Sequence, residues 1–255
     1  MKIPAEWHKK FIKNSFYNPA SPAALARAPA EARFVMRAMK LKKGDRLLDL
    51  CCGPARHALL LAGKGLAVTG YDFSAEYLKE AAAKAEKAKV KIRFLRGDMR
   101  ALKFSGEFDA AINLFTSFGY FLKFSDDLKT LKGAARALKP GGLFMLDIIH
   151  GDYVRNNFSP KNWAKLEDGS YCLEHLKLTK DGALNSWTVI RNGKALERRF
   201  FSRLYSRARI SAALRKAGLV PLKFWGSFNG APLTSKTNRL IALARKPHPP
   251  PRKLV

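Results

Sequence analysis

The chain has 255 residues, with 48 Lys and Arg against 20 Asp and Glu, which gives a formal net charge of +28. Its 47% of hydrophobic residues and its ordinary content of glycine and proline exclude a disordered, collagen-like or low-complexity protein. At this length one large hydrophobic core is expected, and neither disulfides nor a structural metal are needed to stabilise it.

The first 28 residues are predicted to form a lid segment. They contain an aromatic-rich helical stretch over residues 7–17 and a proline-containing break over residues 18–22. A helix is expected to begin at Pro29 and to end near Lys40, since proline suits the first helical position and apolar residues then follow one face. This helix would be the first element of the main domain.

Strands and helices alternate in the next part of the chain. Helices are expected after Ala55, after an N-cap at Ser74, and over residues 125–139, where a KPGG turn follows. Short apolar runs predict strands over residues 47–50, 66–72, 90–95, 108–115 and 143–149. The alternation predicts a doubly wound α/β fold, whose mainly parallel sheet binds ligands at the carboxyl ends of its strands.

The pattern changes after Gly169, where period-two runs are separated by Asp181-Gly182 and Asn192-Gly193. Such dipeptides indicate antiparallel hairpins, so a small antiparallel β cap is expected as an insertion after the fifth strand. A helix over residues 206–217 returns to the main domain, and two last strands extend its sheet in the antiparallel sense. The predicted division is a main domain of residues 29–150 and 206–246, a cap of residues 151–205, and a flexible proline-rich tail of residues 247–255.

Three aspartates follow successive predicted strands. Asp49 precedes the small-residue loop LCCGPA, Asp72 ends the second strand, and Asp98 follows the third. In the strand order 3-2-1-4, three steps of about 4.8 Å cover roughly 15 Å, so one extended ligand could span these sites. The loop permits close backbone approach at a helix N-terminus, but it lacks the G-x-G-x-x-G pattern of a dinucleotide site. A ligand other than NAD is expected.

Five segments carry a more specific signal: LLDLCCGPARHALLLA, VTGYDFS, RFLRGDMRAL, FDAAINLFTSFGYF and LKPGGLFMLDI. In this order and spacing they resemble class I S-adenosylmethionine-dependent methyltransferases, in particular the bacterial small-molecule group that includes sugar N,N-dimethyltransferases. The resemblance covers about residues 27–245. It implies a seven-stranded Rossmann-like methyltransferase fold and S-adenosyl-L-methionine as cofactor. The cofactor-binding residues that it implies are Tyr17, Arg27, Asp49, Cys51, Gly53, Ala55, Asp72, Phe73, Asp98, Met99, Leu114 and Phe115.

The acceptor side is predicted from the loop after the fourth strand, residues 115–121, where small and polar residues interrupt an aromatic cluster. We interpret this loop as a wall of the acceptor pocket. The candidate catalytic residues are Tyr120, in that loop, and His150, just past the fifth strand. In-line methyl transfer depends on alignment and on exclusion of water, so no metal is required. The expected function is methyl transfer to a nitrogen or oxygen of a small-molecule acceptor.

Two alternatives stay open at this point. The charge of +28 and the acid-free stretch after Glu197 fit a nucleic-acid methyltransferase, although the loop reads NLFT where base-amine methylases carry NPPY or similar. The second alternative is a non-catalytic scaffold protein that keeps the cofactor-binding fold. No apolar run approaches about 18 residues, so no membrane span is expected. The charged N-terminus and three cysteines without CxxC spacing predict a cytoplasmic protein. A monomer or a homodimer is expected.

Overall fold

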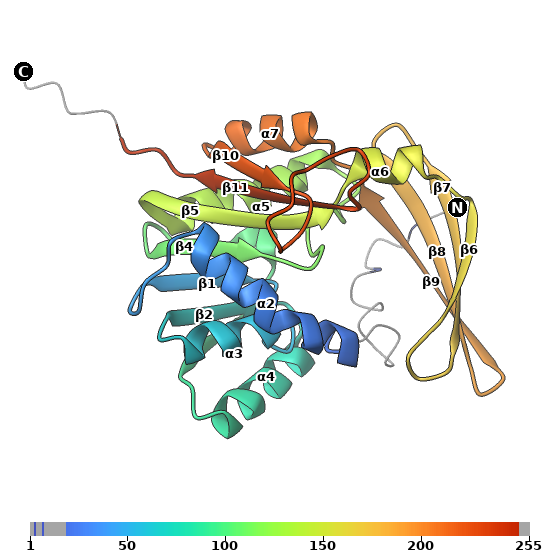
Figure 1. Cartoon of the computed structure of the whole chain (residues 1–255), viewed down its shortest axis with the longest axis horizontal. Helices are drawn as coiled ribbons and strands as arrows, with labels where there is room; N and C mark the ends of the chain where they lie inside the picture. Colours follow the sequence, from blue (N-terminus) through green and yellow to red (C-terminus); the bar gives the residue numbers. More distant parts are fainter. Residues whose placement is uncertain (1–2, 4–6, 8–18, 250–255) are drawn as a thin grey trace, which may run out of the picture.

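The computed structural model describes residues 3, 7 and 19–249, and its larger sheet has seven strands. These are β1 (Arg46–Leu50), β2 (Ala67–Asp72), β3 (Ile92–Arg96), β4 (Phe108–Asn113), β5 (Leu138–Ile149), β10 (Val220–Trp225) and β11 (Arg239–Arg245). Their order is β10-β11-β5-β4-β1-β2-β3 (Figure 1). The pairs among β1 to β5 are parallel, and β11 is antiparallel to both β5 and β10. The predicted sheet and its antiparallel extension are confirmed.

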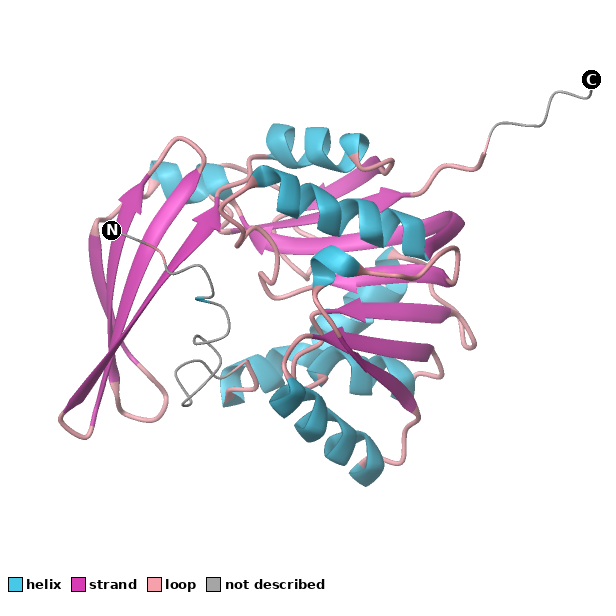
Figure 2. Ribbon diagram, turned by 180° about the vertical axis from the view of Figure 1, so that it is seen from behind, coloured by secondary structure: helices cyan, strands magenta, loops and turns pink. Residues whose placement is uncertain are grey.

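Helices cover both faces of this sheet (Figures 1 and 2). The helices of the main domain are α2 (Pro22–Ala38), α3 (Arg56–Gly63), α4 (Ala75–Lys87), η2 (Met99–Ala101), α5 (Phe124–Ala137) and α7 (Arg207–Lys216). The short helix α6 (Gly151–Asn156) follows β5 and leads to the smaller sheet (Figure 1). One core lies between the sheet and the apolar sides of α5 and α7, around Leu131 and Leu214. A second core lies on the opposite face, where Phe34 of α2 and Leu61 of α3 are buried. The doubly wound arrangement places the carboxyl ends of β1 to β4 at one edge of the sheet, where such folds bind ligands.

The smaller sheet has four antiparallel strands in the order β6-β7-β8-β9. Its strands are β6 (Lys161–Lys165), β7 (Tyr171–Leu178), β8 (Gly182–Arg191) and β9 (Lys194–Arg203). We call it the cap sheet, because it stands opposite the carboxyl ends of the parallel strands (Figure 2). The hairpin between β8 and β9 turns at Asn192 and Gly193, whose φ angles of 49° and 72° are those of the primed turn that Asn-Gly predicts. Both predicted hairpins are confirmed.

The helix predicted to begin at Pro29 begins seven residues earlier, at Pro22. The Ser21 side chain accepts a hydrogen bond from the Ala24 amide and caps the helix. Pro29 lies inside the helix and removes one backbone hydrogen bond. The helix continues through it because the buried side of α2, including Ala28 and Ala32, packs against the sheet, and this packing outweighs the missing bond.

Two strand boundaries and two elements also differ from expectation. β5 begins at Leu138, so the predicted KPGG turn lies within the strand, where Gly141 has a φ of +80° and the register with β4 shifts. β4 ends at Asn113 because Phe115 and Thr116 turn into the left-handed region. β6 and α6 had no sequence signal: every residue of β6 is exposed, so no apolar alternation marks it.

Candidate functional site at the strand ends

The loop after β1 is held in an unusual backbone conformation. Cys51, Gly53 and Ala55 have φ angles of 63°, 51° and 63°, and only one of the three is glycine. Left-handed conformations of residues with a side chain cost free energy and cluster at functional sites. Ala55 is fully buried and begins α3 without a side-chain cap. The loop therefore stores strain where the chain turns from β1 into the helix, as a close backbone approach to a ligand requires.

Asp72, at the end of β2, holds this loop. Its Oδ2 accepts a hydrogen bond of 2.9 Å from the Gly53 amide, and its Oδ1 accepts one of 2.9 Å from the Ser74 amide. Phe73 lies between these contacts, half-buried. An ionised carboxylate has about four acceptor positions, so Asp72 keeps capacity for further donors. Burial raises the pKa of this carboxyl despite the bonds to the amides.

Asp49, in β1, is a buried acid with an unused acceptor atom. Its carboxylate accepts a bond from the Ala58 amide in the first turn of α3, which supplies the cap that Ala55 lacks. Its Oδ2 has no hydrogen-bond partner among the described residues. Burial, followed by the nearby charge of Asp72, raises the pKa of Asp49 to about 7. A buried, unpartnered carboxylate oxygen fits a cationic ligand group such as the ammonium of a methionine moiety.

Asp98 and Met99 continue the edge beyond β3. Asp98 lies two residues past the strand, where Oδ1 accepts from the Arg100 amide and caps η2. Its carboxylate also binds the Arg100 guanidinium, with the Nη2 to Oδ2 contact at 2.6 Å. Met99 Sδ lies 3.4 Å from Cys51 Sγ, so η2 contacts the loop after β1. The structure thus brings Asp49, Asp72 and the Asp98 segment to one edge, as predicted.

The loop after β4 is fixed by a buried acid that the sequence reading missed. Asp147 of β5 accepts a 2.8 Å bond from the Phe115 amide and a 2.9 Å bond from Arg239 Nε. Burial raises its pKa to about 6, although Arg239 acts in the opposite direction. Leu114 is buried beside this contact, and Asn113 Nδ2 donates to the Leu50 carbonyl at 2.9 Å, joining the ends of β4 and β1.

A buried charge cluster supports the same loop from α2 and α3. Arg56 lies with its guanidinium 3.8 Å from the centre of the Phe115 ring, and its Nη2 is 3.6 Å from Glu31 Oε2. His57 Nε2 lies 2.6 Å from the same carboxylate oxygen. Burial lowers the pKa of His57, so its neutral ring donates to the Glu31 carboxylate. The predicted contact residue Arg27 is half exposed, with Nε 3.9 Å from Glu31 Oε1, and Tyr17 lies outside the described residues.

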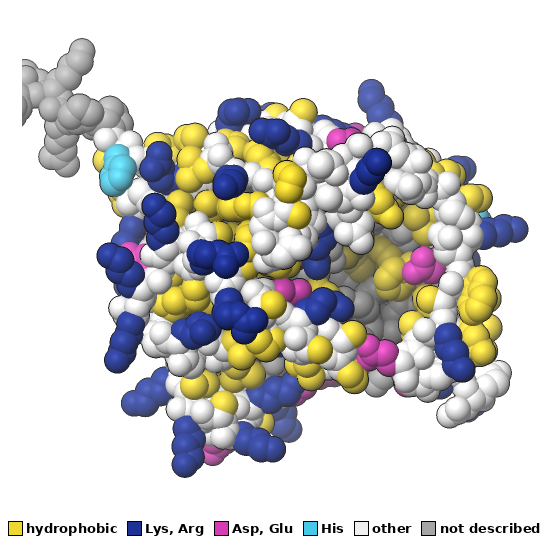
Figure 3. All heavy atoms as spheres, in the orientation of Figure 1, with side chains coloured by type: hydrophobic (Ala, Val, Ile, Leu, Met, Phe, Trp, Pro, Cys, Tyr) yellow, Lys and Arg dark blue, Asp and Glu magenta, His cyan; other side chains and the backbone are white. Residues whose placement is uncertain are grey.

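The two candidate catalytic residues have different surroundings. His150 is 3% exposed, with Nδ1 3.0 Å from the Thr237 carbonyl and Nε2 3.3 Å from Asp152 Oδ2, so both ring nitrogens have partners. Tyr120 stands between the two sheets, its ring centre 5.4 Å from that of Trp7 and 6.2 Å from that of Phe200 of β9. Burial raises the pKa of Tyr120. The molecular surface is hollowed between the two sheets (Figure 3).

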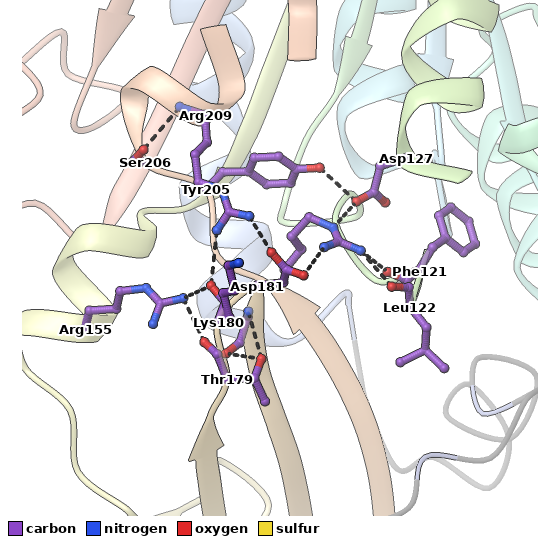
Figure 4. Close-up of polar contacts among 12 residues, drawn as sticks. Phe121, Leu122, Asp127, Arg155, Thr179, Lys180, Asp181, Tyr205, Ser206 and Arg209 are labelled. Atoms are coloured by element: carbon purple, nitrogen blue, oxygen red, sulfur yellow. Dashed lines mark hydrogen bonds and ion pairs between the residues drawn. The ribbon is translucent and has the colours of Figure 1, made fainter. Parts of the chain in front are cut away.

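A buried junction attaches the cap sheet to the main sheet (Figure 4). Arg203, at the end of β9, donates from Nε to Asp127 Oδ2 at 2.7 Å and from Nη2 to the carbonyls of Phe121 and Leu122 at 3.0 and 2.9 Å. The Tyr205 hydroxyl donates to the same Asp127 oxygen at 2.8 Å. Burial raises the pKa of Asp127 to about 6, against the effect of these two donors.

Gly119 adds a backbone contact to this junction, because its carbonyl accepts a 2.6 Å bond from the Arg203 amide. Its φ is +92°, and a Cβ there would lie 3.3 Å from the Arg203 carbonyl oxygen. The junction therefore fixes the loop after β4 to the cap sheet. The sequence reading predicted neither the junction nor the charge cluster, since their partners lie far apart in the chain.

Within the described residues, no cluster of three or more His, Cys, Asp or Glu side chains is arranged to hold a metal ion. None of the helices in the same part of the chain combines the length and apolar character needed to cross a membrane.

Comparison with known proteins shows which of them this chain resembles. Residues 47–142 match the family model described as a methyltransferase domain. The putative methyltransferase YqeM of Bacillus subtilis is 33% identical to the chain over 62% of this chain and 65% of its own length. An S-adenosylmethionine-dependent methyltransferase from Clostridium acetobutylicum has a similar crystal structure, with a TM-score of 0.75 at 22% identity over 86% of this chain and 91% of that one. The sugar N-methyltransferase KedS8 from Streptoalloteichus sp. gives a TM-score of 0.68 at 18% identity over 97% and 96% of the two chains.

The extent of these matches decides what they show. The chain spans slightly less than two thirds of the length of YqeM. At identities of 22% and 18%, the solved structures are evidence for the fold alone. Residues 47–142 thus match the model of a methyltransferase domain, and the chain shares its fold with S-adenosylmethionine-dependent methyltransferases of known structure.

Proposed function

We propose that the protein is a methyltransferase that uses S-adenosyl-L-methionine and methylates a small-molecule acceptor bound between the strand ends and the cap sheet. The observation that carries the proposal is the meeting of Asp49 and Asp72 with a strained loop at one edge, opposite an aromatic wall that includes Tyr120. When bound, the cofactor supplies a methyl group activated on a sulfonium. The protein's part is to hold the two partners in line and to exclude water.

The cofactor roles follow the order of the strands. Asp72 binds the ribose hydroxyls through its remaining acceptor positions, and Asp98 with Met99 lies against the adenine. Asp49 and the loop from Cys51 to Ala55 hold the methionine end, where the Asp49 Oδ2 atom has no partner of its own. Phe73, Leu114 and Phe115 line the path between these groups. Tyr17 and Arg27 close over the methionine carboxylate.

The acceptor roles are assigned from side-chain surroundings. Tyr120 contacts the acceptor directly, because its ring lies between the two sheets with Trp7 and Phe200. His150 positions the segment that follows β5 through its contacts with the Thr237 carbonyl and the Asp152 carboxylate. Any contact between His150 and the acceptor is made from this fixed position. The sugar acceptor in the name of KedS8 supports a small polar molecule as the acceptor class.

Binding of S-adenosylhomocysteine tests the cofactor assignment. At 100 times its Kd, a ligand of the folded state adds about 2.7 kcal/mol, which raises Tm by roughly 5 to 10 °C for a chain of this size. Asp72→Ala should weaken this binding while circular dichroism shows an intact fold. Asp109→Ala is the matched control, since Asp109 lies at the amino end of β4 and pairs with Lys139. An equal Tm shift in wild type and Asp72→Ala would contradict the ribose-binding role of Asp72. No Tm shift in the wild type would contradict the assignment of S-adenosyl-L-methionine as cofactor.

Labelled methyl transfer tests the acceptor class. Wild-type protein is incubated with labelled donor and either a metabolite fraction or an RNA fraction, and the labelled product is identified. The proposal expects label in small molecules. Label in RNA that persists at 0.3 M salt would instead assign the positive charge to specific nucleic-acid recognition.

A further inference from the structure

One face of the cap sheet is directed at the strand ends of the main sheet. Phe200 identifies this face, because its ring lies 6.2 Å from that of Tyr120 in the loop after β4. Phe200 of β9 pairs with Asn185 of β8, which pairs with Leu176 of β7. Directly opposite residues of antiparallel strands project to the same side. These residues therefore form one row on the inner face of the cap sheet, the face toward the main sheet.

The next row on the inner face contains an acid beside an aromatic ring. Glu174 of β7 pairs with Trp187 of β8, which pairs with Arg198 of β9. Cβ atoms of such opposite pairs lie about 4.5 to 5.5 Å apart. The rings of Trp187 and Phe200 pack in a T-shape, with their centroids 5.0 Å apart and an interplanar angle of 88°. Glu174 is thus adjacent to the same aromatic group that reaches Tyr120.

Among the described residues the Glu174 side chain has no counterion, in contrast to the other acid in the cap strands, Glu197. The Glu174 side chain is half-buried and makes no hydrogen bond or ion pair there, and burial raises its pKa. Glu197 projects from the opposite face and is exposed, where Arg199 binds it at 2.9 and 3.0 Å. The exposed acid is paired and the half-buried acid is not, although an unpaired buried charge is costly. An external cation that binds Glu174 would remove this cost.

We infer that Glu174 determines acceptor specificity: it binds a positively charged amine of the acceptor, beside its cross-strand neighbour Trp187. The inference rests on the proposed function and narrows its acceptor class to organic amines. Aromatic rings add cation-π attraction to an ammonium bound by a carboxylate. Because the chain as a whole carries +28, its overall field repels a cation, so recognition has to come from a local acid.

A matched pair of probes tests this inference. Phenethylamine and phenethyl alcohol differ in charge at one position, and calorimetry measures their binding to protein saturated with S-adenosylhomocysteine. We expect wild type to bind the amine about ten- to a hundred-fold more tightly, as is typical of a hydrogen bond to a charged group. Glu174→Gln should abolish this preference with little change in the affinity for the alcohol, and Glu197→Gln should retain it.

Three results would overturn the inference: equal binding of the two probes by wild type, no binding of either, or a preference that survives Glu174→Gln. The affinity for S-adenosylhomocysteine, measured on the same samples, separates this outcome from the proposed function. If the wild type shows no preference for the amine but still binds S-adenosylhomocysteine, the acceptor class alone is refuted. Failure of S-adenosylhomocysteine to bind refutes the methyltransferase assignment, and the probes are then compared on the unliganded protein.

Discussion

The strand-end edge and the cap junction both contain buried aspartates, but those aspartates are used differently. Asp127 in the junction accepts from the Arg203 guanidinium and the Tyr205 hydroxyl. Asp49 at the edge accepts a bond from the Ala58 amide and forms no ion pair among the described residues. Each carboxylate keeps one oxygen without a hydrogen-bond partner there, Oδ1 in Asp127 and Oδ2 in Asp49. The acid of the junction is therefore balanced by a guanidinium, whereas the acid of the edge has no such counterion. Substitutions in the junction should therefore reduce stability, and substitutions at the edge should change binding and pH dependence.

The largest expected effect is on the junction side of this comparison. Arg203→Met should lower the free energy of unfolding by about 3 to 5 kcal/mol, because it leaves Asp127 charged, buried and unpaired. Urea denaturation measures the change. Arg199→Met, on the same strand but exposed, should leave the free energy of unfolding nearly unchanged, because an ion pair at the surface is screened by solvent. Equal effects of the two substitutions would show that the junction does not carry the attachment of the cap sheet.

At the strand-end edge, the contribution of the buried Asp49 to the free energy of unfolding should depend on pH. The pKa of Asp49 is raised from 3.8 to about 7 on folding, so the folded protein binds more protons than the unfolded chain between these values. The contribution of Asp49 is therefore fully favourable below about pH 4 and is lost as pH rises toward 7. Asp49→Asn abolishes this pH-dependent loss of stability, because asparagine does not titrate, and its side-chain oxygen can still accept the hydrogen bond from the Ala58 amide.

The stability of Asp49→Asn relative to wild type should consequently increase with pH, by up to about 1.4 kcal/mol per pH unit between pH 4 and 7. Chemical denaturation at several pH values in that range gives this difference directly. Comparison of the two proteins cancels the contributions of Asp147, Asp127 and His57, whose pKa values also shift. A pH-independent difference would place Asp49 in a solvated environment and contradict its assignment.

The smallest expected effect separates the two regions by binding rather than by stability. Ser74 caps α4 beside Asp72, and Ser206 caps α7 near the junction; each side chain accepts from the third amide that follows. Replacement of either by Ala should cost about 1 kcal/mol of unfolding free energy. Only Ser74→Ala should also weaken S-adenosylhomocysteine binding, since α4 begins next to the Asp72 carboxylate. Equal binding by both variants would show that the start of α4 does not support the edge.

The sequence predicted the features that depend on neighbouring residues. Apolar runs located the strands of the main sheet, Ser74 marked a helix start, and Asn192-Gly193 marked a hairpin. Each of these signals acts within a few residues of the element that it specifies. The convergence of Asp49, Asp72 and Asp98 was also predictable, because parallel strands bring successive carboxyl ends to one edge.

The missed features depend on contacts between distant segments or lack an apolar pattern. Arg203 and Asp127 are 76 residues apart, and nothing in either local sequence identifies the other as its partner. Glu31 meets His57 from a helix whose start was misplaced, since Pro29 has the signature of a helix start yet lies inside α2. β6 is exposed along its whole length, so its residues carry no burial signal. The position of Glu174 on the inner face of the cap sheet could have been predicted from the alternation in β7, because neighbouring residues such as Glu174 and His175 project to opposite faces of a strand.

The most direct test of the central claim is a crystal structure of the protein with S-adenosylhomocysteine. The account predicts that the ribose hydroxyls bind the Asp72 carboxylate and that the methionine ammonium lies near the Asp49 Oδ2 atom, with the sulfur facing the loop after β4. Electron density for the ligand elsewhere, or at this edge without contact to Asp72, would contradict it.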